Sequence, residues 1–130
     1  MVSEYLSLYV LFRSAELLGN IFVVLFFTIS VEVFVAYILD FRRKIEFLAI
    51  ICINLITNPI MNCFLLAYRV GAPSLVEDPP IFMLESLVIL VEWQLLVFVL
   101  RKNQLQMLLL SISMNLASYA LGVLILGDII

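Results

Sequence analysis

Three glutamates lie inside long apolar stretches of this chain, and they are the residues most able to do chemistry. Glu32, Glu85 and Glu92 are flanked by Leu, Ile, Val and Phe, and those stretches contain no Lys, Arg or His. A carboxylate removed from water without a counter-charge is costly. Such a group must hold a proton, face water or bind a cation. Each outcome favours a proton or cation over an anion as the bound species.

Amide and hydroxyl side chains recur at helical spacing in the other apolar stretches. Asn54, Asn58 and Asn62 follow one another at every fourth residue, which predicts an amide ladder on one helix face. A second set shares one face of the last stretch: Ser111, Asn115, Ser118 and Gly122. These groups are suited to completing an oxygen-rich shell around a proton or cation.

One polar residue in each stretch lies about 12 to 15 Å from the end that carries basic residues, counted at the rise of an α-helix. These residues are Glu32, Asn54, Glu92 and Asn115. A charged side chain exposed to lipid at this depth costs about 2.5 to 3.5 kcal/mol, so we expect the four to face one another. The sequence therefore predicts a cation- or proton-binding site made of Glu92, Glu32, Glu85, Asn54, Asn58 and Asn115.

Pro59 lies in the middle of the second stretch and predicts a helix break. It lacks an N–H and would free the carbonyl of Leu55, while Asn58 before it is biased away from helical geometry. Interrupted helices of this kind coordinate cations in transporters. A simple kink, which neighbouring polar groups in a membrane tolerate, is the other interpretation and the one favoured for Pro59 considered on its own.

The same polar residues also support a purely structural interpretation. Neutral Glu, Asn and Ser side chains stabilise contacts between membrane helices by about 0.6 to 2 kcal/mol each. We assign Ser111, Ser118 and Gly122 to helix packing, since small residues allow close approach.

Several classes of chemistry lose their necessary residues. The chain has no histidine, which removes the usual zinc, haem and nucleophile–base arrangements. Cys52 and Cys63 belong to one stretch, too far apart along a helix to form a bridge, and we interpret them as small buried apolar residues. We therefore expect no cofactor apart from a bound cation or proton, and no enzymatic activity, with an embedded enzyme as the remaining alternative.

Composition places these residues in a membrane. Hydrophobic residues make up 65% of the 130-residue chain and charged residues only 13%, which no soluble core of this size could accommodate. The charges separate four spans of membrane-crossing length, at about 19–39, 45–68, 81–100 and 105–126. The predicted fold is an all-α membrane protein with an antiparallel bundle of four transmembrane helices.

The links between spans indicate one membrane domain over residues 1–130. Only residues 69–80, which hold three of the four prolines, form a long connection. The other links are short, so sequential helices should be neighbours. The two halves of the chain show no obvious match to each other.

Residues 3–18 precede the first span and have polar residues at helical spacing. Joined to that span they would form a helix of about 55 Å, too long to cross the bilayer upright. We therefore expect a bend near Gly19 and Asn20 and a short amphipathic helix lying along the membrane interface.

The basic residues predict the orientation of the chain in a cell membrane. Five of the seven cations follow the first and third spans, as Arg42, Arg43, Lys44, Arg101 and Lys102. Because basic residues near span ends stay in the cytoplasm, we expect both short turns to be cytoplasmic and both termini to be non-cytoplasmic.

The chain resembles the small multidrug resistance transporters in size, in its four spans and in having a membrane-buried glutamate. The resemblance is one of architecture, because the glutamate of that family lies early in the first span and Glu32 lies in the cytoplasmic half. Fluoride channels share the size, but their anion selectivity conflicts with three buried carboxylates. No family is assigned on these features.

Two classes of function follow from the sequence. The first is a small transporter or channel that binds a cation or proton and acts as a homo-oligomer, because four helices enclose little volume. The second is a non-catalytic scaffold or assembly subunit whose polar residues hold its own helices, or a membrane-protein partner, together. Nucleic acid is not an expected partner.

Overall fold

The computed structural model describes the backbone of residues 2–71 and 81–126 and the side chains of residues 19–64 and 82–125. It contains four α-helices: α1 (Val2–Ile38), α2 (Lys44–Gly71), α3 (Ile81–Leu100) and α4 (Gln104–Leu126). Each includes an apolar segment long enough to cross a membrane: Gly19–Ile38, Lys44–Phe64, Phe82–Leu100 and Gln104–Ile125. The prediction of four apolar helices of spanning length is confirmed, and the described backbone has no strand.

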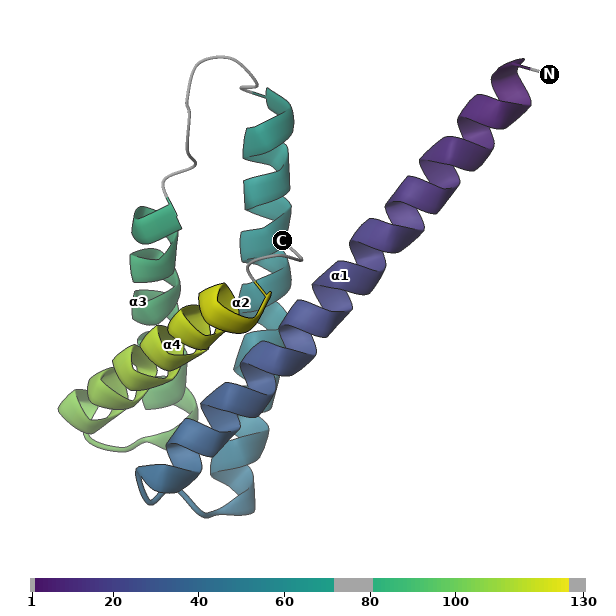
Figure 1. Cartoon of the computed structure of the whole chain (residues 1–130). Coiled ribbons are helices and arrows are strands. Elements are labelled where there is room, and N and C mark those ends of the chain that lie inside the picture. Colours follow the sequence, from purple (N-terminus) through teal and green to yellow (C-terminus); the bar gives the residue numbers. More distant parts are fainter. Residues whose placement is uncertain (1, 72–80, 127–130) are drawn as a thin grey trace.

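Helix α1 differs from the prediction at its N-terminal part. Residues 3–18, expected as a separate interfacial helix, continue into the first span, and no helix end falls at Gly19 or Asn20 (Figure 1). A glycine inside a helix costs only about 1 kcal/mol relative to alanine, which does not by itself end a helix. The expected bend is therefore corrected to one continuous helix.

Helix α2 also continues where an interruption was expected. It runs from Lys44 to Gly71 with Pro59 inside it, so the predicted break is absent. A proline removes one backbone hydrogen bond, and a membrane helix tolerates that loss because hydrogen bonds elsewhere in the helix persist. The predicted connection at residues 69–80 is shorter than expected, since α2 includes its first three residues; the remainder lies outside the described residues.

The four helices contact one another in a ring. Helix α1 contacts α2 and α4, and α3 contacts the same two helices, whereas the α1–α3 and α2–α4 pairs have no close contact within the described residues. Both short turns lie at the same end of the molecule, the lower end in Figure 1. We call this the loop end, formed by residues 39–43 and 101–103, and the opposite end the terminal end.

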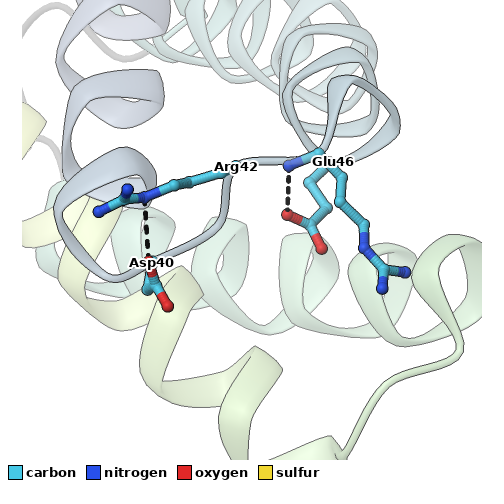
Figure 2. A network of polar contacts seen from close by, with 4 residues as sticks. Asp40, Arg42 and Glu46 are labelled. Atoms are coloured by element: carbon cyan, nitrogen blue, oxygen red, sulfur yellow. Dashed lines mark hydrogen bonds and ion pairs between the residues drawn. The ribbon is translucent and has the colours of Figure 1, made fainter.

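The turn between α1 and α2 is defined by local chemistry. Asp40 has a φ of 70° and ends α1, with the N–H of Phe41 donating to the carbonyl of Ala36 at 3.0 Å. This is a Schellman arrangement, in which a left-handed residue stops the helix and satisfies its last carbonyls. At the start of α2 the N–H of Arg43 donates to Glu46 Oε2 at 3.0 Å, and Arg42 pairs with Asp40 beside it (Figure 2).

The turn between α3 and α4 has a similar design. Arg101 has a φ of 51° and ends α3. Asn103 then caps α4, because its Oδ1 accepts the N–H of Leu105 at 2.9 Å. Both hairpins therefore turn within a few residues. These short turns fix the position of each helix along the bundle axis relative to the next helix.

The apolar core occupies the half of the bundle nearest the loop end. It lies between the turns and the level of Glu32 and Glu92. Its buried members are Ala36, Phe41, Ile50, Ile53, Leu96, Met107, Leu110 and Met114. Large apolar side chains cover the outside of all four helices, as expected of surfaces that face lipid.

Candidate functional site

Two buried glutamates, one from α1 and one from α3, form the centre of a polar network. Glu32 is 0% exposed and Glu92 is 1% exposed. Each is met by side chains from both α2 and α4. The network therefore involves all four helices.

Each glutamate contacts one amide and one hydroxyl group. Asn54 Nδ2 donates to Glu32 Oε2 at 2.5 Å, and Ser118 Oγ lies 3.4 Å from Glu32 Oε1.

The second glutamate has matching partners. Asn115 Nδ2 donates to Glu92 Oε2 at 2.5 Å, and Thr57 Oγ1 lies 2.8 Å from Glu92 Oε1. Every carboxyl oxygen of the two glutamates thus has one polar neighbour, and none of these neighbours is charged.

The hydroxyl groups limit where protons can lie in this network. Thr57 Oγ1 is 3.1 Å from the carbonyl of Ile53, and Ser118 Oγ is 3.1 Å from the carbonyl of Asn115. A hydroxyl has one proton and two lone pairs, so it can donate to the helix carbonyl or to the carboxyl oxygen, but not to both. When it donates to the carbonyl, it can accept a hydrogen bond from a protonated carboxyl group. The groups of the network can therefore keep hydrogen-bond partners whether the glutamates are protonated or deprotonated.

The amide ladder of α2 leads away from the carboxyl pair towards the terminal end. Asn58 Nδ2 donates to Asn54 Oδ1 at 2.5 Å, and Asn62 Nδ2 donates to the carbonyl of Asn58 at 3.0 Å. Exposure rises along the ladder, from 1% at Asn54 and 7% at Asn58 to a half-buried Asn62. Glu85 is half-buried on α3, about 10 Å beyond Glu92 along the helix axis, and has no hydrogen bond to the network.

The residues assigned to helix packing take different places. Ser111 is fully buried and donates to the carbonyl of Ile89 at 2.9 Å, which ties α4 to α3. Ser118 contacts Glu32 and therefore belongs to the polar network. At Gly122 an added Cβ would meet no atom within 4 Å, so packing does not require glycine there.

The two halves of the chain supply equivalent residues. When Glu32 is aligned with Glu92 and one residue is inserted before the next helix, the segment NLIT at 54–57 corresponds to NLAS at 115–118, and both segments give an amide and a hydroxyl to the glutamates. Six buried positions of α2 correspond to the buried positions of α4: Glu46 with Met107, Ala49 with Leu110, Ile50 with Ser111, Ile53 with Met114, Asn54 with Asn115, and Thr57 with Ser118. The buried Asn58 aligns with the exposed Tyr119. The two helical hairpins thus share a burial pattern around the glutamates.

Some residues of functional interest were missed by sequence reasoning. Thr57 contacts Glu92 but gave no signal beyond its proximity to Pro59. Glu46 is 2% exposed and pairs with Lys102 at 2.5 Å, which joins α2 to the other hairpin's turn. Cys52 and Cys63 are exposed rather than buried, because they lie on the outward face of α2.

The residues present do not form a recognisable metal centre. Among the described residues, no group of three or more His, Cys, Asp or Glu is placed to hold a metal ion. The amide nitrogens that point at the carboxyl oxygens are hydrogen-bond donors and not metal ligands. The chain matches no known protein family, no curated protein and no solved structure.

Proposed function

We propose that this protein is a small membrane transporter or channel whose buried carboxyl pair, Glu32 and Glu92, binds and releases protons. The observation that carries the proposal is the neutral surroundings of the pair: all four carboxyl oxygens have amide or hydroxyl neighbours. The ion pairs recorded among the described side chains lie at the loop end. A proton removes the cost of an unpaired charge in this setting.

Proton binding explains the hydrogen-bond partners of Glu32 and Glu92 better than metal binding does. A metal ion would need oxygen atoms directed at one point, whereas each carboxyl group here receives an N–H from an asparagine. Protonation requires only that the Thr57 and Ser118 hydroxyls stop donating to the carboxyl oxygens and accept hydrogen bonds from them. Each hydroxyl can then donate to a helix carbonyl at 3.1 Å.

A second candidate is a scaffold in which the network only holds the helices together. It is favoured by the observation that no buried polar side-chain atom lacks a hydrogen-bond partner among the described residues. A fully satisfied network stabilises a bundle whether or not protons move through it.

The proposal also includes an assembly and an orientation. Four helices with a packed interior enclose little space for a substrate, which supports a homo-oligomer as the functional unit. The basic turns support a cell-membrane orientation with the loop end in the cytoplasm and both termini outside.

Glutamine substitution gives a clean test. Gln is close in shape to a protonated Glu. In Glu92→Gln, the side-chain carbonyl can accept a hydrogen bond from Asn115, and the side-chain amide NH2 can donate one to Thr57. We expect Glu32→Gln and Glu92→Gln each to reduce proton flux at least tenfold, measured with a pH-sensitive dye trapped in proteoliposomes under an imposed potential. Thermal unfolding and elution volume should stay close to those of the unmodified protein.

Asp40→Asn is the matched control, since Asp40 is an exposed carboxylate at the loop end and Asn tolerates its positive φ. It should leave flux unchanged. Absence of proton flux from the unmodified protein, or flux from both Gln variants equal to that of the unmodified protein, would refute the proposal. Loss of folding together with loss of flux would favour the scaffold.

A further inference from the structure

The loop end of the bundle is closed by apolar packing. Every member of the apolar core lies between the carboxyl pair and the two turns, and Ile50, Leu96 and Met107 are each at most 1% exposed. On the other side of the carboxyl pair, Leu25 is the one buried apolar side chain among the residues described. Among the described side chains, the dense apolar packing therefore lies on the loop side of the glutamates.

An ion pair reinforces this closure. Lys102 Nζ, from the turn after α3, pairs with Glu46 Oε1 on α2, and the same ammonium group lies 4.7 Å from the centre of the Phe41 ring. Glu46 also accepts the N–H of Arg43. One lysine thus connects both turns across the loop end.

Among the described residues on the terminal side of the carboxyl pair, the amide ladder and Glu85 each come from only one of the two hairpins at their level. Asn58 and Asn62 of α2 align with Tyr119 and Val123 of α4. Glu85 of α3 aligns with Leu25 of α1 when Glu92 is aligned with Glu32. The burial pattern of the two hairpins therefore matches on the loop side and at the carboxyl pair, and differs at Asn58, where polar groups lead outward.

We propose that, in this conformation, protons reach the carboxyl pair from the terminal end, through water held along Asn62, Asn58 and Glu85, while the packed loop end is closed and must open in another conformation for a proton to cross the membrane. The statement that the bound species is a proton rests on the proposed function, whereas the direction of access rests on burial alone. Glu85 acts as the intermediate carboxyl group, since an amide neither takes up nor releases a proton readily. Asn58 and Asn62 are positioning residues for the water.

Substituted cysteines test the direction of access without any measurement of transport. Cys52 and Cys63 are first replaced by alanine, which their exposed positions allow. Single cysteines are then introduced by Asn62→Cys and Glu85→Cys, with Arg42→Cys as the reference for the loop end. A charged, membrane-impermeant methanethiosulfonate is applied to intact cells and, separately, to inverted membrane vesicles.

We expect Asn62→Cys and Glu85→Cys to react at least tenfold faster in one preparation and Arg42→Cys in the other. Ile53→Cys, inside the apolar core, should react in neither until the protein is unfolded in detergent. Reaction of Asn62→Cys and Glu85→Cys from the same side as Arg42→Cys, or no reaction at either, would overturn the inference.

A kinetic variant separates this inference from the proposed function. Glu85→Gln should slow proton flux several-fold while Glu32→Gln abolishes it, and Asp40→Asn again serves as control. Flux that is abolished by Glu32→Gln but unchanged by Glu85→Gln would leave the proposed function standing and remove Glu85 from the route. Terminal-side labelling without any proton flux would leave the access path standing and remove the function.

Discussion

At the scale of single residues, the hydroxyl groups are what allow one network to serve two protonation states. An asparagine N–H can only donate, so it suits the carboxyl oxygen that lacks a proton. The hydroxyls of Thr57 and Ser118 can donate or accept a hydrogen bond, and each can donate to a helix carbonyl at 3.1 Å. The carboxyl oxygens that face these hydroxyls, Glu92 Oε1 and Glu32 Oε1, are therefore the positions where we expect the protons to bind.

Removal of these hydroxyls should destabilise the bundle measurably. We expect Thr57→Val and Ser118→Ala each to lower the free energy of unfolding in detergent by about 1 to 2 kcal/mol, because each leaves a buried carboxyl oxygen without its partner. Ser30→Ala and Ser113→Ala are controls, since these exposed hydroxyls only bond to their own helix backbone. The controls should change stability by less than about 0.5 kcal/mol. Equal effects at all four positions would contradict the assigned contacts.

The sequence predicted which carboxyl and amide groups meet, but not all of their partners. Glu32, Asn54, Glu92 and Asn115 could be placed at one level because the helical rise and short turns fix depth. The role of Thr57 could not be predicted, because a threonine in a membrane helix commonly bonds to its own backbone and the contact with Glu92 depends on helix rotation. The buried position of Glu46 could not be predicted for a similar reason, since its distance from the membrane surface gave no indication that Lys102 covers it.

At the scale of elements, the number and extent of the helices followed from composition, whereas their continuity did not. Gly19 and Pro59 are helix-weakening residues, and both lie inside uninterrupted helices. Their cost of about 1 and 3 kcal/mol relative to alanine is smaller than what long apolar helices gain by keeping backbone groups paired in lipid. Asp40, by contrast, ends α1 in a left-handed conformation, and the charge cluster around it made that end predictable.

The ion pair between Glu46 and Lys102 should be the strongest polar contact between the two hairpins outside the carboxyl network. Lys102→Gln would leave Glu46, 2% exposed, without its counter-charge. We expect a loss of about 1 to 3 kcal/mol in unfolding free energy, less than for a fully buried pair because the Lys102 side chain is 32% exposed.

Two further variants identify the source of that loss. Glu46→Gln combined with Lys102→Gln should recover part of the stability, since no unpaired charge remains. Arg42→Gln, which breaks the exposed pair with Asp40, should cost less than about 1 kcal/mol. If the loss of stability in the double variant instead equals the sum of the losses in Glu46→Gln and Lys102→Gln measured singly, the two groups are not coupled.

At the scale of the whole molecule, the two hairpins have corresponding contacts. Exchanging α1 with α3 and α2 with α4 converts each observed contact of Glu32 into the corresponding contact of Glu92. Both hairpins run in the same direction, as in transporters built from parallel repeats. This correspondence was not evident from the sequence, because few residues other than those of the network are shared.

The same geometry makes the orientation in the membrane testable, since both turns lie at one end and, together with Lys44 at the start of α2, carry five of the seven cations. We expect a reporter fused after Ile130 to be active only outside the cytoplasm, because basic residues near span ends are retained inside. Lys102 is partly covered by its pair with Glu46, so Arg42, Arg43 and Lys44 should dominate. Replacing these three by glutamine should therefore shift part of the population to the inverted orientation, whereas Lys102→Gln should have a smaller effect. A cytoplasmic C-terminus in the unmodified protein would reverse the assignment and place the proposed proton entrance on the cytoplasmic side.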